Sequence, residues 1–145
     1  MAREDFVCAH RLRVRWAEVD MQKIVFNGHY LTYIDTAIAE YWREIGLPYP
    51  HGYVERYGND VYLRKATVEY LGSARYDDEL TVCCRVAKLG RSSMTFVFEI
   101  HREGAPPLVT AELVYVNADP QMRPAPLPDE VREKVRRYER VAPQS

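Results

Sequence analysis

Residues 27–45, NGHYLTYIDTAIAEYWREI, carry the strongest structural signal in this sequence. Apolar side chains recur at helical spacing, and the apolar face is wider than that of a helix with one covered side. This face comprises Tyr30, Leu31, Tyr33, Ile34, Ala37, Ile38, Tyr41, Trp42 and Ile45. Asn27 is a favoured N-cap residue, and Gly46 followed by Pro48 is a typical stop signal. The stretch therefore predicts a long helix that is covered on more than one side and lies at the centre of the fold.

Five further stretches are strand-like, and all but residues 61–71 alternate between apolar and polar residues with the period of two that is typical of half-buried strands. They are residues 6–16, 61–71, 79–89, 92–101 and 108–117. The joints between the last four stretches have hairpin lengths and turn residues, which predicts an antiparallel meander. These joints are Tyr76-Asp77-Asp78, Gly90-Arg91 and Gly104-Ala105-Pro106-Pro107. We expect an α+β domain in which a curled antiparallel sheet of about five strands wraps around the central helix.

The remaining segments complete a single domain, residues 1–145, with a core of about residues 6–119. Residues 47–60 contain prolines and glycines without a regular period, which predicts a connector with one short helical turn. A proline-rich spacer, residues 120–128, precedes a charged stretch, residues 128–140, that predicts a short C-terminal helix. The sequence has no internal repeat and no domain linker.

Composition and charge exclude several classes of function. The 20 basic and 21 acidic residues give a formal net charge of −1, whereas a dedicated nucleic-acid-binding protein normally has a basic excess. No stretch approaches the roughly 20 apolar residues of a membrane span, and no apolar run follows the charged N-terminus as in a signal peptide. Three cysteines, two of them adjacent, are poorly suited to a disulfide framework. We therefore expect a cytoplasmic protein without nucleic-acid or membrane partners.

The histidines and cysteines indicate no metal site and no cofactor. The four histidines lack the spacing of metal ligands. They are His10, His29, His51 and His101. Cys83 and Cys84 point to opposite faces of a predicted strand, so Cys84 is expected in the core and Cys83 is expected to be half-exposed.

Residues 16–30, which comprise the loop before the helix and the start of the helix, are the most informative place for chemistry. Asp20 precedes a helix N-terminus, whose free main-chain N–H groups and positive dipole end can polarise a carbonyl oxygen. A carboxylate beside such groups stays ionised and can act as a base or a nucleophile. The residues also leave open that Asp20 is a turn aspartate, which only accepts hydrogen bonds from nearby main-chain N–H groups.

This region resembles the opening signature of the hot-dog-fold acyl-CoA thioesterases of the 4-hydroxybenzoyl-CoA thioesterase type. The segments that carry the resemblance are Arg15-Trp16-Ala17-Glu18-Val19-Asp20, Ile24-Val25-Phe26-Asn27 and Tyr30-Leu31-x-x-Ile34-Asp35. Segments 67–71, 75–79 and 89–93 match as well, so the resemblance runs from about residue 6 to residue 119. It implies a hot-dog fold, and a homodimer or homotetramer with active sites at the subunit interface.

The resemblance also implies a reaction, the hydrolysis of an acyl-CoA thioester to free acid and coenzyme A. The family's catalytic aspartate, a general base or nucleophile, corresponds to Asp20, and the main-chain N–H that binds the thioester oxygen falls near Asn27. Coenzyme A is then part of the substrate, and no metal or redox cofactor is implied. The family usually has glycine at the position of Lys23, which leaves the shape of the loop open.

Four further residues are weaker candidates. His29 could orient water or substrate, and it could equally be a turn histidine. Lys88, Arg91 and Ser93 flank a predicted hairpin turn, where they could hold the phosphates of coenzyme A or simply contact solvent.

The helix itself supplies candidates for the acyl pocket. Its aromatic and aliphatic members Tyr30, Tyr33, Ile34 and Ile38 are suited to lining such a pocket. Asp35 and Glu40 face either the acyl pocket or solvent.

Two functions of other classes remain open alongside hydrolysis. A hot-dog dehydratase or hydratase needs a histidine that faces a carboxylate, and only His29 lies suitably near the helix. A non-catalytic module would bind acyl-CoA without turnover.

Overall fold

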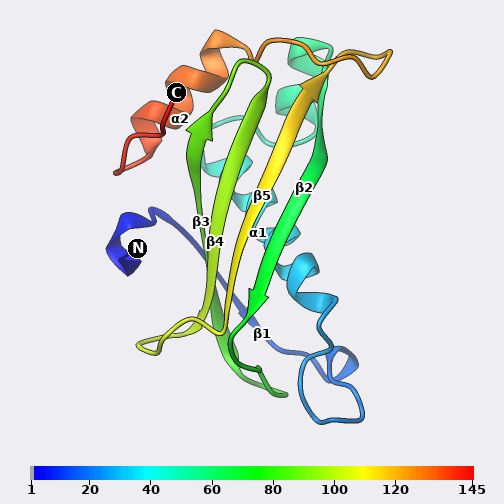
Figure 1. Cartoon of the computed structure of the whole chain (residues 1–145), viewed down its shortest axis with the longest axis vertical. Helices are drawn as coiled ribbons and strands as arrows, with labels where there is room; N and C mark the ends of the chain where they lie inside the picture. Colours follow the sequence, from blue (N-terminus) through cyan, green and yellow to red (C-terminus); the bar gives the residue numbers. More distant parts are fainter. Residues whose placement is uncertain (1) are drawn as a thin grey trace.

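One antiparallel sheet of five strands curls around helix α1 (His29–Glu44) in the computed structural model, which describes residues 2–145 (Figure 1). The strands are β1 (Cys8–Arg13), β2 (Asp60–Tyr70), β3 (Glu79–Leu89), β4 (Ser93–Arg102) and β5 (Val109–Ala118). The other helical elements are η1 (Arg3–Asp5), η2 (Trp16–Glu18), η3 (His51–Glu55) and α2 (Asp129–Tyr138). The predicted α+β architecture, including the short turn in the 47–60 connector and the C-terminal helix, is confirmed.

Helix α1 is central because seven of its side chains are buried. They are Tyr30, Tyr33, Ile34, Ala37, Ile38, Tyr41 and Trp42. Its start differs from the prediction, since the helix begins at His29 with Gly28 at the N-cap position. Asn27 is therefore not the N-cap, and no side chain caps this end. Gly46 ends the helix with a φ of +86°, the left-handed conformation that glycine adopts without strain.

The order of the strands, β1-β3-β4-β5-β2, corrects the predicted meander. Strands β3, β4 and β5 are joined by hairpins as predicted, but β2 pairs with β5 instead of β3. Residues 71–78 are consequently a crossover between separated strands and not a hairpin. A crossover of this length contains the same turn residues as a hairpin, so local sequence does not distinguish the two.

Strand β2 forms an edge of the sheet, and no other strand among residues 2–145 pairs with its outer side. Most of its residues are exposed, including the large apolar side chains of Leu63 and Tyr70 at 51% and 49%. An edge strand of this length offers unpaired main-chain groups to another chain.

The C-terminal segment is docked on the core. Val131 and Val135 of α2 are buried, and the last residues extend β3 beyond the end of β1, where Gln144 bonds with Ala87 and Leu89. Glu139 is also buried, and its Oε2 accepts hydrogen bonds from the Tyr41 hydroxyl at 2.7 Å and from the Val86 N–H at 2.8 Å. No helix in the described part of the chain is long and apolar enough to cross a membrane.

The two adjacent cysteines are both fully buried. Cys84 lies in the core as predicted, but the expectation that Cys83 is half-exposed is wrong. Cys83 is the cross-strand partner of Glu99, and both Glu99 and Phe6 line a hollow on the outer face of the sheet. The N-terminal segment thus lies over this face, and burial raises the pKa of Cys83 to about 11.

Candidate active site

Asp20 and Asn27 line one pocket of about 310 Å³ at the N-terminal end of α1. The other lining residues are Gln22, Ile24, Val25, Tyr30, Tyr70, Gly72 and Ser73. The loop before α1 thus forms one wall, and the end of β2 with the following loop forms the other. The structure therefore brings together the two residues that the resemblance placed at the reaction centre.

Asp20 begins a tight turn of five residues. Its N–H donates to the Ile24 carbonyl at 3.0 Å, its carbonyl accepts from the Lys23 N–H at 2.9 Å, and its Oδ1 accepts from the Gln22 N–H at 2.8 Å. The expectation that Asp20 caps a turn is therefore correct for one oxygen. The other oxygen, Oδ2, accepts no hydrogen bond from residues 2–145. This oxygen is available to take up a proton or to attack a carbonyl carbon.

Lys23 adopts a φ of +66°, in the left-handed region that favours glycine. A side chain there costs about 1–2 kcal/mol, because its Cβ approaches the following carbonyl oxygen. The loop therefore has the conformation that a glycine would provide, although the chain carries a lysine at this position.

Asn27 contributes its main chain to the pocket. Neither its N–H nor that of Gly28 has an acceptor in the described chain, and both precede the first turn of α1. Unsatisfied N–H groups and the helix dipole make this end of a helix favourable for a negatively charged oxygen. The helix start can thus bind an oxyanion even though Asn27 is not its N-cap.

His29 lies beside this pocket without lining it. It is the first residue of α1, and its ring packs edge-on against Phe26, with 5.9 Å between the ring centroids. No histidine is among the residues that line the pocket, so the histidine and carboxylate of a dehydratase do not meet there. A role for His29 in orienting water or substrate stays a prediction.

Glu18 is a buried carboxylate of this region that sequence reasoning missed. It accepts hydrogen bonds from the Arg15 N–H and the Tyr33 hydroxyl, both at 2.8 Å, and its carbonyl accepts from the Phe26 N–H. Burial acts to raise the pKa of Glu18, but the Arg15 N–H, the Tyr33 hydroxyl and the Arg15 guanidinium together hold it below its usual value. Glu18 thus joins η2 to α1 and supports the loop that carries Asp20. Two signals in the sequence could have found it, the Arg15–Glu18 spacing of three residues and its place in the Arg15–Asp20 segment that carries the family resemblance.

A second cleft of about 290 Å³ lies further along α1. It is lined by Asp35, Ile38, Ala39, Trp42, Tyr49, Val61, Phe96 and Tyr115. Asp35 is its one charged lining residue, and it follows Asn27 by eight positions, which is about 12 Å along a helix. Glu40 lines neither the pocket nor the cleft and pairs instead with Arg43.

The four apolar helix residues that were expected to line an acyl pocket separate into two groups. Tyr30 lines the Asp20 pocket and Ile38 lines the cleft, whereas Tyr33 and Ile34 are buried in the core and line neither.

The turn between β3 and β4 lies at the opposite end of the sheet from the loop after β2, which lines the Asp20 pocket (Figure 1). Strand β4 has ten residues and spans about 30 Å, and its far end, Arg102, contacts Ser73 of the pocket. Lys88 and Ser93 line a hollow on the outer face of the sheet, and the Arg91 carbonyl accepts a hydrogen bond from Arg132. Within one chain, the structure therefore does not bring Lys88, Arg91 and Ser93 to Asp20.

Within residues 2–145, no group of three or more His, Cys, Asp or Glu side chains is arranged to hold a metal ion.

Residues 22–107 match the sequence model of the thioesterase superfamily. A putative esterase from Aquifex aeolicus is 33% identical over 94 residues, which cover 65% of this chain and 72% of the relative. The acyl-CoA thioester hydrolase YbgC of Escherichia coli O6:H1 is 29% identical over 121 residues, which cover 83% of this chain and 89% of the relative.

Solved structures agree with this result. A thioesterase from Thermus thermophilus, in complex with coenzyme A and zinc, is 29% identical with a TM-score of 0.81, and the match covers 94% of this chain and 96% of that one. The hypothetical protein AQ1494 from Aquifex aeolicus is 28% identical with a TM-score of 0.80, over 88% of this chain and 98% of that one. The matched family covers more than half of the chain, and the predicted hot-dog fold is confirmed. This chain belongs to the thioesterase superfamily and is a thioester hydrolase with the hot-dog fold.

Proposed function

We propose that the protein hydrolyses an acyl-CoA thioester to the free acid and coenzyme A in the Asp20 pocket. The observation that carries the proposal is the composition of this pocket, where a carboxylate oxygen without a donor lies with the free N–H groups at the start of α1. Two relatives support the substrate class, since one is named an acyl-CoA thioester hydrolase and another was solved with coenzyme A.

The free N–H groups of Asn27 and Gly28 act on the thioester carbonyl oxygen. As a nucleophile adds to the carbonyl carbon, negative charge develops on that oxygen, and these donors with the dipole of α1 stabilise it. Loss of one such donor typically costs about 10²–10³ in rate.

Asp20 serves as general base or as nucleophile. As a base, its Oδ2 takes a proton from water while the water oxygen attacks the carbonyl carbon, and the C–S bond breaks to release the coenzyme A thiolate. As a nucleophile, the carboxylate attacks the carbonyl carbon, releases the thiolate and forms a mixed anhydride, which water then hydrolyses. In the base route the thiolate takes up the proton that Asp20 accepted from water. In the nucleophile route the thiolate takes up a proton from solvent, which hydrolysis of the anhydride later replaces.

The acyl group extends from the pocket along α1 towards the second cleft. Tyr30 at the pocket and Ile38 in the cleft support this path, and so do the aromatic rings that line the cleft. Asp35 lies about 10–12 Å along the helix axis from the oxyanion donors that precede α1, so it meets the distal part of the acyl group.

A homodimer or homotetramer is part of this proposal. The unpaired edge of β2 and its exposed Leu63 and Tyr70 support pairing with a second chain. Lys88, Arg91 and Ser93 can hold coenzyme A phosphates only if another copy supplies their turn, because about 30 Å of strand separates it from the pocket in one chain.

A thiol-release assay with short, long and aromatic acyl-CoAs tests the proposal. We expect release of coenzyme A from at least one class at a rate that depends on Asp20. Binding of every acyl-CoA without release of thiol would instead identify a non-catalytic binding module. Single-turnover hydrolysis in ¹⁸O-water tests for the anhydride, because label enters the Asp20 carboxylate only when water attacks the enzyme's carboxyl carbon of that intermediate.

A further inference from the structure

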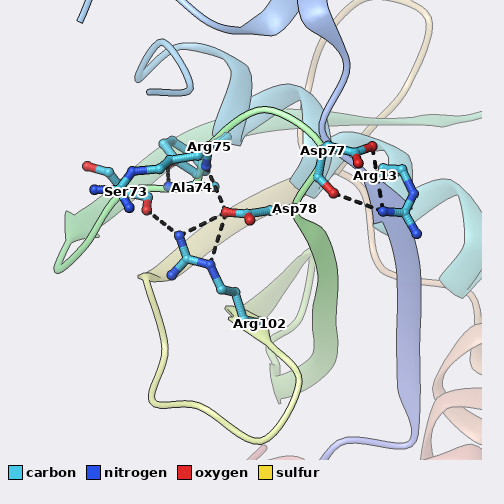
Figure 2. Close-up of polar contacts among 8 residues, drawn as sticks. Arg13, Ser73, Ala74, Arg75, Asp77, Asp78 and Arg102 are labelled. Carbon is cyan, nitrogen blue, oxygen red and sulfur yellow. Dashed lines mark hydrogen bonds and ion pairs between the residues drawn. The ribbon is translucent and has the colours of Figure 1, made fainter. Parts of the chain in front are cut away.

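The loop that forms the second wall of the Asp20 pocket, residues 71–78, is held by one guanidinium group at the end of β4 (Figure 2). Arg102 lies between Ser73 and Asp78, and its Nη2 is 2.8 Å from the Ser73 carbonyl oxygen and 2.8 Å from Oδ2 of Asp78. Its Nε donates to the same carboxylate oxygen at 3.0 Å. Arg102 thus binds both ends of the loop at once.

The carboxylate of Asp78, which pairs with Arg102, is also bound by the main chain of the loop. Its Oδ2 also accepts a hydrogen bond from the Arg75 N–H at 2.8 Å. Burial acts to raise the pKa of Asp78, but the Arg75 N–H and the Arg102 guanidinium together hold it below its usual value. The carboxylate is therefore charged at neutral pH, and Arg102 and Asp78 remain an ion pair.

The held loop is bonded to the catalytic side of the pocket through Ala74, which is fully buried. The Ala74 N–H donates to the Tyr30 hydroxyl at 2.9 Å, and the Ala74 carbonyl accepts from the Val25 N–H at 2.9 Å. Val25 in turn bridges to Val19, the residue before Asp20. A short series of hydrogen bonds therefore leads from the loop that Arg102 holds to the turn that carries Asp20.

The bond from Ala74 also determines what Tyr30 can do. Because the phenolic oxygen accepts from the Ala74 N–H, the O–H proton of Tyr30 is directed elsewhere, and it has no acceptor within residues 2–145. Tyr30 lines the Asp20 pocket, so this proton is available to a bound group there.

We propose that Arg102 is a positioning residue for hydrolysis. Together with Asp78 it clamps loop 71–78, so that Ala74 holds the Tyr30 hydroxyl and the Val25 main chain in the geometry that the Asp20 pocket requires. This inference rests on the function proposed for that pocket. Arg102 touches no reacting atom, and its effect passes through Ser73 and Ala74.

Arg13 provides a matched control on the same loop. Its Nη1 donates to the Asp77 carbonyl at 2.8 Å, and its Nη2 lies 3.2 Å from Oε2 of Glu79 (Figure 2 shows the Asp77 contact). Arg13 and Arg102 thus each bind one main-chain carbonyl and at least one carboxylate of neighbouring residues. In the described chain Arg13 makes no hydrogen bond or ion pair with residues 72–74, so it holds the loop without a polar contact to the pocket wall.

The test compares Arg102→Met, Arg102→Lys and Arg13→Met in the full chain. We expect Arg102→Met to lower kcat for acyl-CoA hydrolysis by about 10–100-fold with little change in KM, because a misplacement of about 1 Å in a site can cost as much as 100-fold. Arg102→Lys restores the contact with Asp78 but cannot bridge to Ser73, so an intermediate kcat is expected. Arg13→Met is expected to retain kcat within about twofold, as for a surface substitution away from the site.

Amide hydrogen exchange supplies the measurement that a general loss of stability would not reproduce. With Arg102→Met, exchange at Ala74 and Val25 is expected to become at least about tenfold faster while the amides of β3 and β4 keep their protection. Unchanged exchange at these two amides, or a wild-type kcat, would overturn the clamp. Equal losses of kcat and thermal stability in the Arg102→Met and Arg13→Met variants would also overturn it.

Failure of the proposed function gives a different result. The wild-type chain would then hydrolyse none of the acyl-CoAs, whereas Arg102→Met would still accelerate exchange at Ala74 and Val25.

Discussion

Asp20 and Asp119 begin the same five-residue turn at opposite ends of the sequence. In each turn the aspartate N–H donates to the carbonyl four residues later, and its Oδ1 accepts from the N–H two residues later. The fourth residue has a positive φ in both turns, +66° at Lys23 and +65° at Met122. The turns differ in the second carboxylate oxygen, since Oδ2 of Asp119 accepts from Arg123 at 3.3 Å and Oδ2 of Asp20 accepts no bond within residues 2–145. Contacts within the turn therefore account for both carboxylate oxygens of Asp119 but for only one carboxylate oxygen of Asp20.

This relationship supplies a control for the catalytic prediction. Asp20→Asn retains the shape and the turn hydrogen bond but removes the basicity and the nucleophilicity of the carboxylate. We expect single-turnover hydrolysis of an acyl-CoA to slow by about 10²–10⁴, while a non-hydrolysable analogue binds nearly as well. Asp119→Asn makes the same change in the same kind of turn and is expected to hydrolyse at the wild-type rate. Wild-type hydrolysis by Asp20→Asn would show that Asp20 is only a turn residue.

The left-handed conformation of Lys23 predicts that glycine is tolerated there. Lys23→Gly relieves about 1–2 kcal/mol of steric strain and loses about 0.4–1 kcal/mol through the greater freedom of the unfolded chain. We expect the free energy of unfolding, measured in urea, to rise by up to about 1.5 kcal/mol with hydrolysis retained. Met122→Gly in the matching turn is expected to behave alike. A clear loss of stability in Lys23→Gly would mean that its side chain makes a contribution larger than the strain.

The buried carboxyl group of Glu139 is expected to make the free energy of unfolding depend on pH. Burial raises its pKa, although the Tyr41 hydroxyl, the Val86 N–H and the Arg85 guanidinium act to lower it. The folded state therefore favours the protonated acid, so the stability that Glu139 contributes is fully present below its ordinary pKa of about 4.3 and is lost as the pH rises through the folded value. Glu139→Gln has no such proton to lose. We expect the stability of the wild-type chain relative to Glu139→Gln, from urea unfolding at several pH values, to fall as the pH rises from about 4 to 8.

An exposed position on α2 provides the control for this pH dependence. Glu133→Gln also removes one carboxylate, but from a side chain that is 66% exposed and pairs with Arg137. Its difference from the wild-type chain is expected to change little over the same pH range. Identical pH slopes for Glu139→Gln and Glu133→Gln would contradict the role assigned to burial.

The open edge of β2 predicts self-association. Size-exclusion chromatography with light scattering is expected to give a dimer or tetramer at micromolar concentration. Leu63→Lys places a charge on this exposed strand, so it is expected to shift the protein towards monomer and to lower hydrolysis. Met122→Lys, at a similarly exposed apolar side chain outside β2, is expected to retain the assembly. A fully active monomer would contradict the proposal that a second copy completes the site.

The central helix, the curled sheet and the acidic residue at the helix start follow from local patterns in the chain. The apolar period of α1 predicts burial on several sides, and the alternation in β3, β4 and β5 predicts strands joined by hairpins, because both patterns report which faces of an element avoid water. The sequence also predicts that Asp20 lies near free N–H groups, because Asp20 precedes a helix and every helix N-terminus has such groups whatever the surrounding fold.

The meeting of distant segments, by contrast, is visible only in the folded chain. Strand β2 pairs with β5, and Glu18 accepts a hydrogen bond from Tyr33, fifteen residues later in the chain. Arg102 at the end of β4 donates a hydrogen bond to Ser73 in the loop after β2. A period of two or 3.6 residues specifies a buried face but not the partner of a strand edge or of a polar side chain. The reason is physical. Which face of an element is buried depends on the spacing of apolar residues along that element alone. Each of these pairings depends also on where the folded chain places a second element.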